Sequence, residues 1–246
     1  MLSYRKINLL FIALICFILI LVLLKTIPLY FVFILLFVYI SILSYGVVFI
    51  KANFYLNSIQ KLKNKNQILL SFDDGPDPAL TPLILDLLDQ YDAKALFFII
   101  GNRAEKFPAV IKEIQARGHI IGNHSWSHHH YFDFFSVNKM IVEVERTNEL
   151  LQQILGEKPL YFRPPFGITN PRIRRLVEKT GMKSVSWSFR SYDTKSRSNE
   201  RIIKKMRTDI KGGQILLFHD TIPRTYQILK ETLPYLCEKY SLNPEI

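Results

Sequence analysis

The sequence contains little cysteine. Only Cys16 and Cys237 occur among its 246 residues, and Cys16 lies within a long apolar run. No disulfide framework can be built from this pair, so cysteine usage does not indicate a redox compartment. Internal repeats and low-complexity tracts are also absent. Because 49% of the residues are hydrophobic, the chain can form a packed core, and intrinsic disorder is excluded as its general state.

Acidic residues are missing from the first quarter of the chain. Residues 1–66 hold seven of the 32 Lys and Arg residues and none of the 21 Asp and Glu residues. The other 180 residues therefore carry 25 basic and 21 acidic side chains, a net charge of +4 out of the total of +11. Since the basic character arises from the N-terminal segment, it is poor evidence for nucleic-acid binding, and we expect no nucleic-acid partner.

Two long stretches lack charge altogether. Residues 7–24 and 27–50 are uncharged runs of 18 and 24 residues, separated by Lys25 and Thr26. A helix needs about 20 apolar residues to cross the hydrocarbon core of a bilayer. One continuous helix would be roughly twice too long, and Lys25 with Pro28 supplies a break. We predict two transmembrane helices, about 7–24 and 27–50, that together form a membrane anchor over residues 1–50.

Other interpretations of these runs fit less well. A cleavable signal peptide has a shorter apolar region followed by a small-residue cleavage site, which is absent here. A buried pair of core helices is the remaining alternative. The chain is therefore expected to be an integral membrane protein, of the kind found in a bacterial inner membrane, with membrane lipid as a partner.

Basic residues flank the two predicted spans unequally. Arg5 and Lys6 precede the first span, only Lys25 lies in the turn, and four lysines follow the second span within 51–66. By the positive-inside rule this distribution favours a cytoplasmic position for the rest of the chain, although the basic residue in the turn weakly favours the opposite orientation.

The remaining sequence reads as a basic linker, 51–66, followed by one α/β domain over 67–246. Short apolar runs that resemble buried strands alternate there with segments of helical periodicity, which indicates parallel β/α units. The predicted strands are 67–72, 95–100, 119–122, 160–163, 184–188 and 214–219. This pattern predicts a distorted, incomplete (β/α) barrel, with an open doubly wound sheet as the alternative. In either fold the functional residues gather at the carboxyl ends of the strands.

Two adjacent carboxylates follow the first predicted strand. Asp73 and Asp74 precede Gly75 and Pro76, and two neighbouring acids repel each other unless a cation or a division of roles separates them. The alternative is that one of them only caps the helix that begins near Pro78.

Four histidines follow the third predicted strand. His124 and His128 are four residues apart, a spacing typical of metal ligands, whereas we interpret His129 and His130 as bystanders. Two imidazoles and one carboxylate suit a divalent metal with an open position. Zn²⁺ suits this set best, and Co²⁺, Ni²⁺, Fe²⁺ and Mn²⁺ are alternatives.

Two more polar motifs end predicted strands. Arg163, followed by two prolines, is placed to hold a carboxylate ionised, or else forms an ordinary surface ion pair. His219 follows the strand 214–219 and is either a titratable site residue or a buried core histidine.

Four of these motifs together resemble a known family. The sequences SFDDGP, GHIIGNHSWSH, RPPFG and LLFHD occur in the order and spacing of the polysaccharide deacetylase family, also called carbohydrate esterase family four or the NodB-like domain. The resemblance covers about residues 67–240. It implies a distorted (β/α) barrel and a hydrolase acting on carbon–nitrogen (non-peptide) bonds, which uses a divalent metal to remove N- or O-acetyl groups from sugars. It also implies that Asp74, His124 and His128 bind that metal.

The same resemblance implies roles for five other residues. Asp73 would be the general base, tethered by Arg163, and His219 the general acid. The backbone N–H of Phe166, where the family commonly has tyrosine, would help to hold the oxyanion. Leu217 would line the pocket for the acetyl methyl group.

One motif departs from the family pattern. The family usually has an Asp-x-x-Asp-Trp element after the fifth strand, but here Arg190 stands in the first acidic place and Thr194 in the tryptophan place. We expect the surviving Asp193 to pair with His219 and to raise its pKa. Arg190 suits an acidic or phosphate-bearing substrate. The chain also ends soon after the helix expected at 226–240, so we expect a short or absent closing strand.

These observations lead to one principal hypothesis. The chain is expected to be a membrane-anchored, metal-dependent carbohydrate deacetylase, with an acetylated cell-envelope polysaccharide or a lipid-linked sugar precursor as its substrate. The alternatives are a catalytically inactive, membrane-bound carbohydrate-binding or scaffold protein, and a hydrolase of a non-sugar amide.

Overall fold

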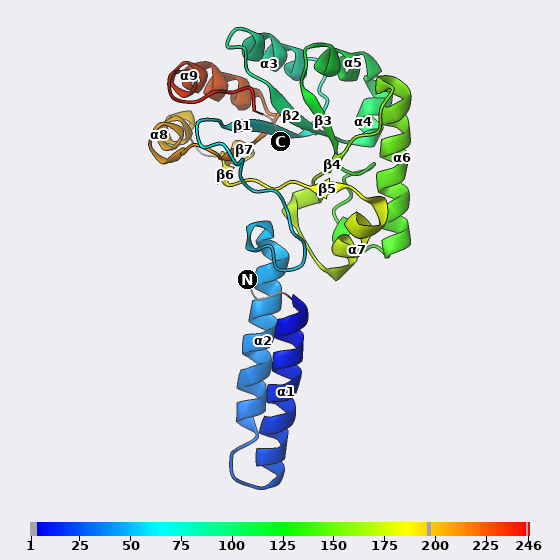
Figure 1. The fold of residues 1–246 in the computed structure, drawn as a ribbon, viewed down its shortest axis with the longest axis vertical. Helices are drawn as coiled ribbons and strands as arrows, with labels where there is room; N and C mark the ends of the chain where they lie inside the picture. Colours follow the sequence, from blue (N-terminus) through cyan, green and yellow to red (C-terminus); the bar gives the residue numbers. More distant parts are fainter. Residues whose placement is uncertain (1–3, 196–197, 245) are drawn as a thin grey trace.

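The chain forms a helical hairpin joined to an α/β domain (Figure 1). The computed structural model describes residues 4–195, 198–244 and 246. The hairpin consists of α1 (Tyr4–Leu23) and α2 (Tyr30–Val48), with mean hydropathies of 2.9 and 2.5 over windows that are almost entirely exposed. By length and composition both helices are able to cross a membrane, and a signal sequence passes the same test.

The hairpin is held together by few contacts. The ring of Phe11 stacks on that of Tyr39 at 4.9 Å, and the Tyr39 hydroxyl donates a hydrogen bond to Asn8 Oδ1. Ile7 and Val32 are also buried, whereas most of the other apolar side chains of both helices are exposed or partly exposed. Such an exposed apolar surface is stable in lipid and unstable in water.

The domain is built on one curled, fully parallel sheet in the order β5-β4-β3-β2-β1-β7-β6. Its strands are β1 (Leu69–Gly75), β2 (Ala95–Ile99), β3 (Ile120–Asn123), β4 (Tyr161–Phe162), β5 (Lys183–Ser184), β6 (Phe189–Arg190) and β7 (Ile215–His219). The predicted distorted barrel is confirmed, in the form of a half-barrel that stays open between β5 and β6. Two details of the prediction are wrong. The strand expected at 184–188 is limited to β5, and β6 was not predicted, because two residues carry no readable periodicity.

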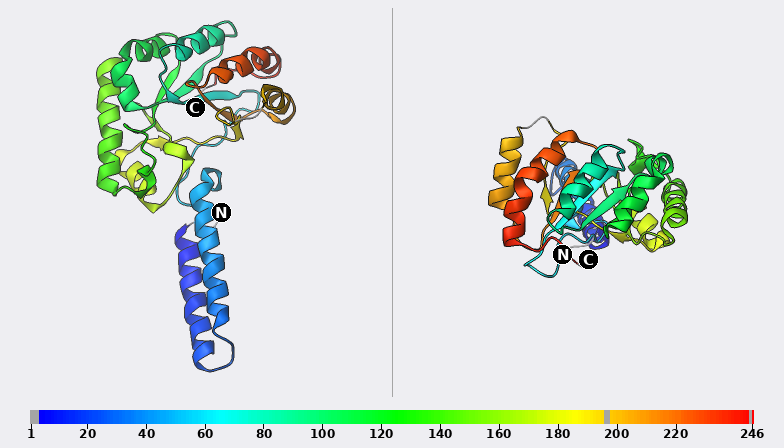
Figure 2. Two further views of the ribbon diagram at one scale, coloured as in Figure 1. Left: turned by 180° about the vertical axis from the view of Figure 1, so that it is seen from behind. Right: turned by 90° about the horizontal axis from the view of Figure 1, so that it is seen from above.

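Helices cover the outer surface of this sheet (Figure 2). They are α3 (Leu80–Asp89), α4 (Gly101–Lys106), α5 (Pro108–Ala116), α6 (Val137–Leu155), α7 (Pro171–Thr180), α8 (Asn199–Asp209) and α9 (Pro223–Lys239), with short 3₁₀ turns η1 (Ile50–Ala52), η2 (Phe132–Phe134) and η3 (Pro165–Gly167). The largest core lies between the central strands and α3, α5, α8 and α9, where the rings of Phe72 and Phe97 stack at 4.8 Å. After α9, as expected, the described residues form no further strand, only an isolated bridge between Gln67 and Ser241.

The segment expected to be a linker is built into the open edge of the half-barrel. The Ile59 N–H donates to the Ser184 carbonyl beside β5, and the Leu62 N–H donates to the Gly213 carbonyl just before β7. Since β5 and β6 are very short, their edges leave unpaired backbone groups, and this segment satisfies part of them.

The end of α2 lies against the carboxyl end of the sheet. The Thr169 N–H donates to the carbonyl of Val47, and the Thr169 hydroxyl donates to that of Gly46; both acceptors are in the last turn of α2. Ile50, two residues beyond α2, is buried against Trp187 and against Leu217 of β7. From there the chain crosses the open edge and reaches the amino end of β1 at Leu69. The helical hairpin is therefore attached at the end of the sheet where the polar motifs gather.

Candidate metal centre and active site

The polar motifs meet in one pocket at the carboxyl ends of the strands. Asp73 in β1 is the register partner of His219 in β7, and the loop after β3 brings His124 and His128 beside them. The pocket has a volume of about 240 Å³. It is lined by Asp73, Asp74, His124, His128, Phe166, Trp187, Arg190, Thr194, Leu217 and His219.

Three of these residues form a candidate metal site. Oδ1 of Asp74 lies 3.5 Å from Nε2 of His124 and 3.4 Å from Nε2 of His128. All three ligand atoms fall within 4.8 Å of one another. Asp74 and His128 hold positive φ values of 74° and 48°, an uncommon backbone state for such residues that is often kept at functional sites.

The surroundings of this cluster fit a divalent cation. Nδ1 of His124 lies 2.7 Å from the Arg163 carbonyl, which can only accept, so that nitrogen carries the proton and Nε2 presents its lone pair. Burial and the neighbouring His124 lower the pKa of His128 to about 4, which keeps its ring neutral. Burial disfavours a charge on His124, but Asp73 and Asp74 outweigh it and raise the pKa of His124. A carboxylate and two imidazoles that attract positive charge are donors suited to zinc.

Arg163 lies at the centre of the hydrogen-bond network under the pocket. Its side chain is fully buried, and Nη1 donates to Oδ1 of Asp73 at 2.6 Å and to the Ser71 hydroxyl at 3.0 Å. Nε and Nη2 donate to the carbonyls of Val185 and Ser186. These bonds orient the Asp73 carboxylate and keep one of its oxygens directed toward the pocket, 3.8 Å from Nε2 of His124.

His219 is held by Asp193, the contact expected from the sequence. Oδ1 of Asp193 accepts from Nδ1 of His219 at 2.9 Å, and Oδ2 accepts from the His219 backbone N–H at 2.7 Å. Burial disfavours the imidazolium, but the hydrogen bond and charge of Asp193 outweigh it and raise the pKa of His219. Thr225 and Ser191 also donate to Asp193, and sequence reasoning missed both because hydroxyl residues carry no pattern of their own.

Asp220 is a further buried carboxyl group, to which the sequence analysis assigned no role. Its Oδ2 accepts from the Thr81 hydroxyl at 2.5 Å, and burial raises the pKa of Asp220 to about 7. A Cβ at Gly75 would collide with this carboxyl group, which explains why a glycine follows the two aspartates. Asp220 thus packs beneath the turn that carries Asp74.

Phe166 and Leu217 both line the pocket. Phe166 has a positive φ of 60°, and its half-exposed ring contacts the ring of His128 at 4.6 Å. Leu217 is buried against Trp187 and Ile50. His129 and His130 are exposed and contribute no atom to the metal cluster, although His130 stacks on Phe166 at 5.9 Å.

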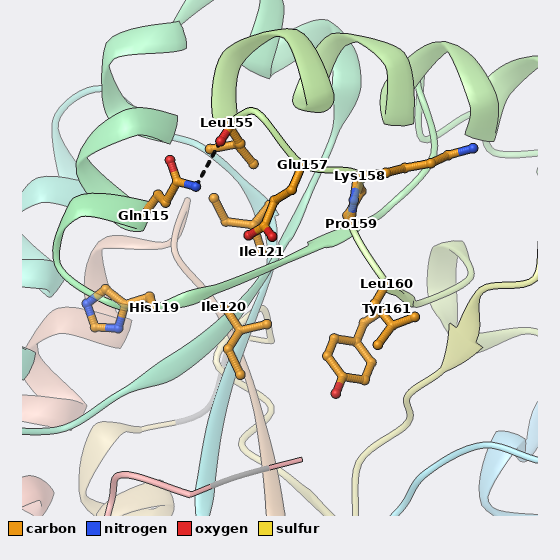
Figure 3. A pocket seen from close by; sticks show the side chains of 10 residues that line it. All are labelled: Gln115, His119, Ile120, Ile121, Leu155, Glu157, Lys158, Pro159, Leu160 and Tyr161. Atoms are coloured by element: carbon orange, nitrogen blue, oxygen red, sulfur yellow. Dashed lines mark hydrogen bonds between the residues drawn. The ribbon is translucent and has the colours of Figure 1, made fainter.

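A different hollow, of about 210 Å³, lies near the amino ends of β3 and β4 (Figure 3). Gln115 donates there to the Leu155 carbonyl, and Glu157 and Lys158 lie on its rim. Burial lowers the pKa of His119, its one histidine, to about 4. Within the described ranges, this hollow contains no cluster of metal-ligating side chains.

Comparisons with known proteins agree with this architecture. The family model for polysaccharide deacetylase matches residues 60–185, about half of the chain. A peptidoglycan-N-acetylglucosamine deacetylase of Bacillus cereus is 37% identical over 159 residues, which cover 64% of this chain and 57% of that relative. A chitooligosaccharide deacetylase of Azorhizobium caulinodans is 32% identical, covering 65% of this chain and 77% of the relative. Both relatives are named as deacetylases of carbohydrates.

A solved structure extends the likeness to three dimensions. The peptidoglycan deacetylase PdaC of Bacillus subtilis superposes with a TM-score of 0.67 at 31% identity, over 75% of this chain and 87% of that chain. The first relative, however, is matched over little more than half of its own length.

If Asp74, His124 and His128 bind a metal, replacing one of them should weaken metal binding, whereas replacing a neighbouring histidine should not. Replacing His128 with alanine removes one of three ligand atoms, and we expect Zn²⁺ affinity to fall at least about 100-fold, since even outer partners of metal ligands are worth 10–100-fold. Isothermal titration of the metal-free full chain measures this change. His129→Ala, which removes an exposed imidazole next to it, is the matched control and should bind Zn²⁺ like the parent. Equal affinities of the two variants would contradict the assignment.

Proposed function

The chain belongs to the polysaccharide deacetylase family, and from that premise we propose that it is a metal-dependent carbohydrate deacetylase anchored in a membrane. The observation that carries the proposal is the single pocket in which Asp73, Asp74, His124, His128 and His219 converge. The substrate is an acetylated carbohydrate, either a cell-envelope polysaccharide or a lipid-linked sugar precursor. An N-acetyl group is hydrolysed to a free amine and acetate.

The proposed metal site is Asp74, His124 and His128, with Zn²⁺ as the cation that suits these donors best. A bound divalent cation supplies a Lewis acid that polarises the acyl carbonyl and acidifies water. The two imidazoles and the carboxylate would hold it close to the Asp73 carboxylate, one oxygen of which lies 3.8 Å from Nε2 of His124.

The other residues divide the proton transfers. Asp73, oriented by Arg163, accepts a proton from the water that attacks the acyl carbon. The backbone N–H of Phe166 donates to the carbonyl oxygen as negative charge develops on it. His219, kept protonated by Asp193, donates a proton to the amine nitrogen as the carbon–nitrogen bond breaks. Leu217 contacts the methyl of the acyl group.

The helical hairpin is proposed as the anchor. Residues 1–50 form two membrane spans, and the catalytic domain follows from 67 after the basic segment 51–66. The exposed apolar surfaces of α1 and α2 support this division, since water would oppose them. The basic flanks on the domain side of both spans favour a cytoplasmic catalytic domain.

The central test removes the proposed base. Asp73→Asn keeps the shape of the side chain but cannot accept the proton, so we expect kcat for acetate release from N-acetylated oligosaccharide to fall about 10²–10⁴-fold while Zn²⁺ binding is retained. Asp92→Asn, the same change on an exposed residue, is the control and should leave kcat unaltered. A parent protein that binds Zn²⁺ and sugar without releasing acetate would instead be a carbohydrate-binding protein.

Replacing Asp193 is expected to shift the pH dependence of kcat. His219 acts in its protonated form, so the raised pKa extends activity toward alkaline pH, and activity falls as the pH rises through that pKa. Asp193→Asn removes the charge that raises the pKa. We therefore expect the alkaline limb of the kcat profile to move toward lower pH, measured between about pH 5 and pH 10. An unmoved alkaline limb would show that Asp193 does not set the protonation of His219.

The orientation of the anchor is testable with reporters fused after Ile246. One reporter is active only outside the cytoplasm, and the other fluoresces only within it. The basic flanks predict fluorescence and no external activity. The opposite pattern would place the domain outside and would rule out cytoplasmic intermediates as substrates. A fusion after Lys25, in the turn between the spans, is the control and should report the other side.

A further inference from the structure

The pocket lies beside the end of α2 that joins the domain. Ile50 follows the end of α2 by two residues, and its buried side chain packs on Trp187 and Leu217, both of which line the pocket. The loop that carries Phe166 is attached to the same end of α2 through Thr169. In Figure 1, α2 likewise ends next to β6 and β7. If α1 and α2 span a bilayer, the pocket lies at its surface.

Three exposed aromatic side chains, here called the aromatic rim, lie on the segments beside the pocket, and one of them, Phe166, lines it. Phe166, Tyr131 and Phe134 are 44%, 65% and 70% exposed, respectively. Phe166 stacks on His130, which precedes Tyr131 in the chain, and Tyr131 packs edge-on to Phe134 at 6.4 Å. The Asn170 side chain, next to Thr169, donates to the Asp133 carbonyl and so ties this rim to the loop beside α2. Exposed aromatic side chains at this level are typical of a membrane interface.

Three cations lie on the same side of the pocket. Arg190 lines the pocket and is the register partner of Leu217. Arg190 and Lys205 both lie over the ring of Tyr192, at 5.4 and 5.5 Å. Lys51, the residue after Ile50, donates to the Ser188 carbonyl beside β6.

This cation cluster lacks an acidic partner in the part of the chain that the structure describes. No carboxylate lies within ion-pair distance of Arg190, Lys51 or Lys205 there, and Nε of Arg190 is buried without a hydrogen-bond partner. Leaving a buried donor of a charged group unpaired costs free energy, which an anionic ligand would recover. A guanidinium pairs with the oxygens of a phosphate through parallel hydrogen bonds.

We propose, on the basis of the proposed deacetylase function, that the substrate is a saccharide carried on a membrane lipid through a phosphate, which Arg190 binds together with Lys51 and Lys205. The geometry of such a substrate matches the pocket. In a 2-acetamido sugar 1-phosphate, the amide nitrogen and the phosphoester oxygen are on adjacent ring carbons. An acyl group against Leu217 therefore places the phosphate next to Arg190, while the lipid chain enters the bilayer beside α2.

The test uses the full-length Zn²⁺-loaded chain in nanodiscs of zwitterionic lipid and measures acetate release. The probes are a synthetic prenyl monophosphate ester of N-acetylglucosamine, soluble N-acetylglucosamine 1-phosphate, and neutral chitotetraose. We expect kcat/KM to be highest for the prenyl phosphate ester. Arg190→Ala should lower the ratio of kcat/KM for this ester to that for chitotetraose by roughly tenfold to a hundredfold. Arg190→Lys should recover part of the loss, and Lys230→Ala, the same loss of charge on the exposed face of α9, should not change the ratio.

Other outcomes separate the possible failures. Preference for chitotetraose, or an equal effect of Arg190→Ala on every substrate, would overturn the lipid-phosphate proposal and leave the deacetylase function standing. A preference for the ester that disappears in nanodiscs containing anionic lipid would show that the cations bind phospholipid headgroups, and would also overturn it. Release of acetate from none of the three, with Zn²⁺ bound, would overturn the proposed function itself.

Discussion

The buried contact between Arg163 and Asp73 organises the half-barrel and its pocket. A guanidinium with no exposed surface is stable only when its charge and its donors are satisfied, and here each nitrogen has a partner on β1 or on the segment that follows β5. The carbonyl of the same Arg163 fixes the tautomer of His124. One residue therefore sets the position of the proposed base and the ring orientation of a proposed metal ligand. Loss of either partner would leave an uncompensated charge in the core.

A second level of support lies beneath the polar residues. Asp193 is surrounded by donors from Ser191, Thr225 and His219, and Asp220 is held by Thr81 under the turn that carries Asp74. Apart from Ser191, these groups come from segments far apart in the sequence, and together they restrict the rotation of Asp193 and Asp220, which support the pocket residues His219 and Asp74. Such preorganisation reduces the rearrangement needed during a reaction.

The segment between the helical hairpin and the domain is in contact with the sheet and with residues that line the pocket. It closes the open edge of the sheet through Ile59 and Leu62 and brings Ile50 to the wall of the pocket. The pocket and the ends of the apolar helices are therefore held at a fixed distance. These contacts agree with the proposal that the substrate reaches the pocket from the surface of a bilayer.

Much of the fold and the candidate site was predictable from the sequence. The long strands β1, β2 and β7 are continuous apolar runs, and β1 and β7 end in polar motifs, so both their existence and the end of the sheet that carries the chemistry could be inferred. The bounds of β5 and the existence of β6 could not, because these short strands are defined by pairing with neighbours and not by any local pattern. The contacts of the segment 51–66 with the sheet could not be predicted for a similar reason: its basic, polar composition resembles solvated chain, while its backbone bonds to the edge of the sheet.

By itself, the sequence determined the residue types at the pocket, the order of the motifs and the two apolar runs, since these depend on local composition and spacing. Only the tertiary structure decided that Lys51 and Arg190 lie on one side of the pocket and that Thr225 supports Asp193. It also decided that Ile50, just after α2, packs on Trp187 and Leu217. Contacts of this kind join residues that are distant along the chain. They result from how the helices and strands pack, and packing depends on the shapes of all the buried side chains together.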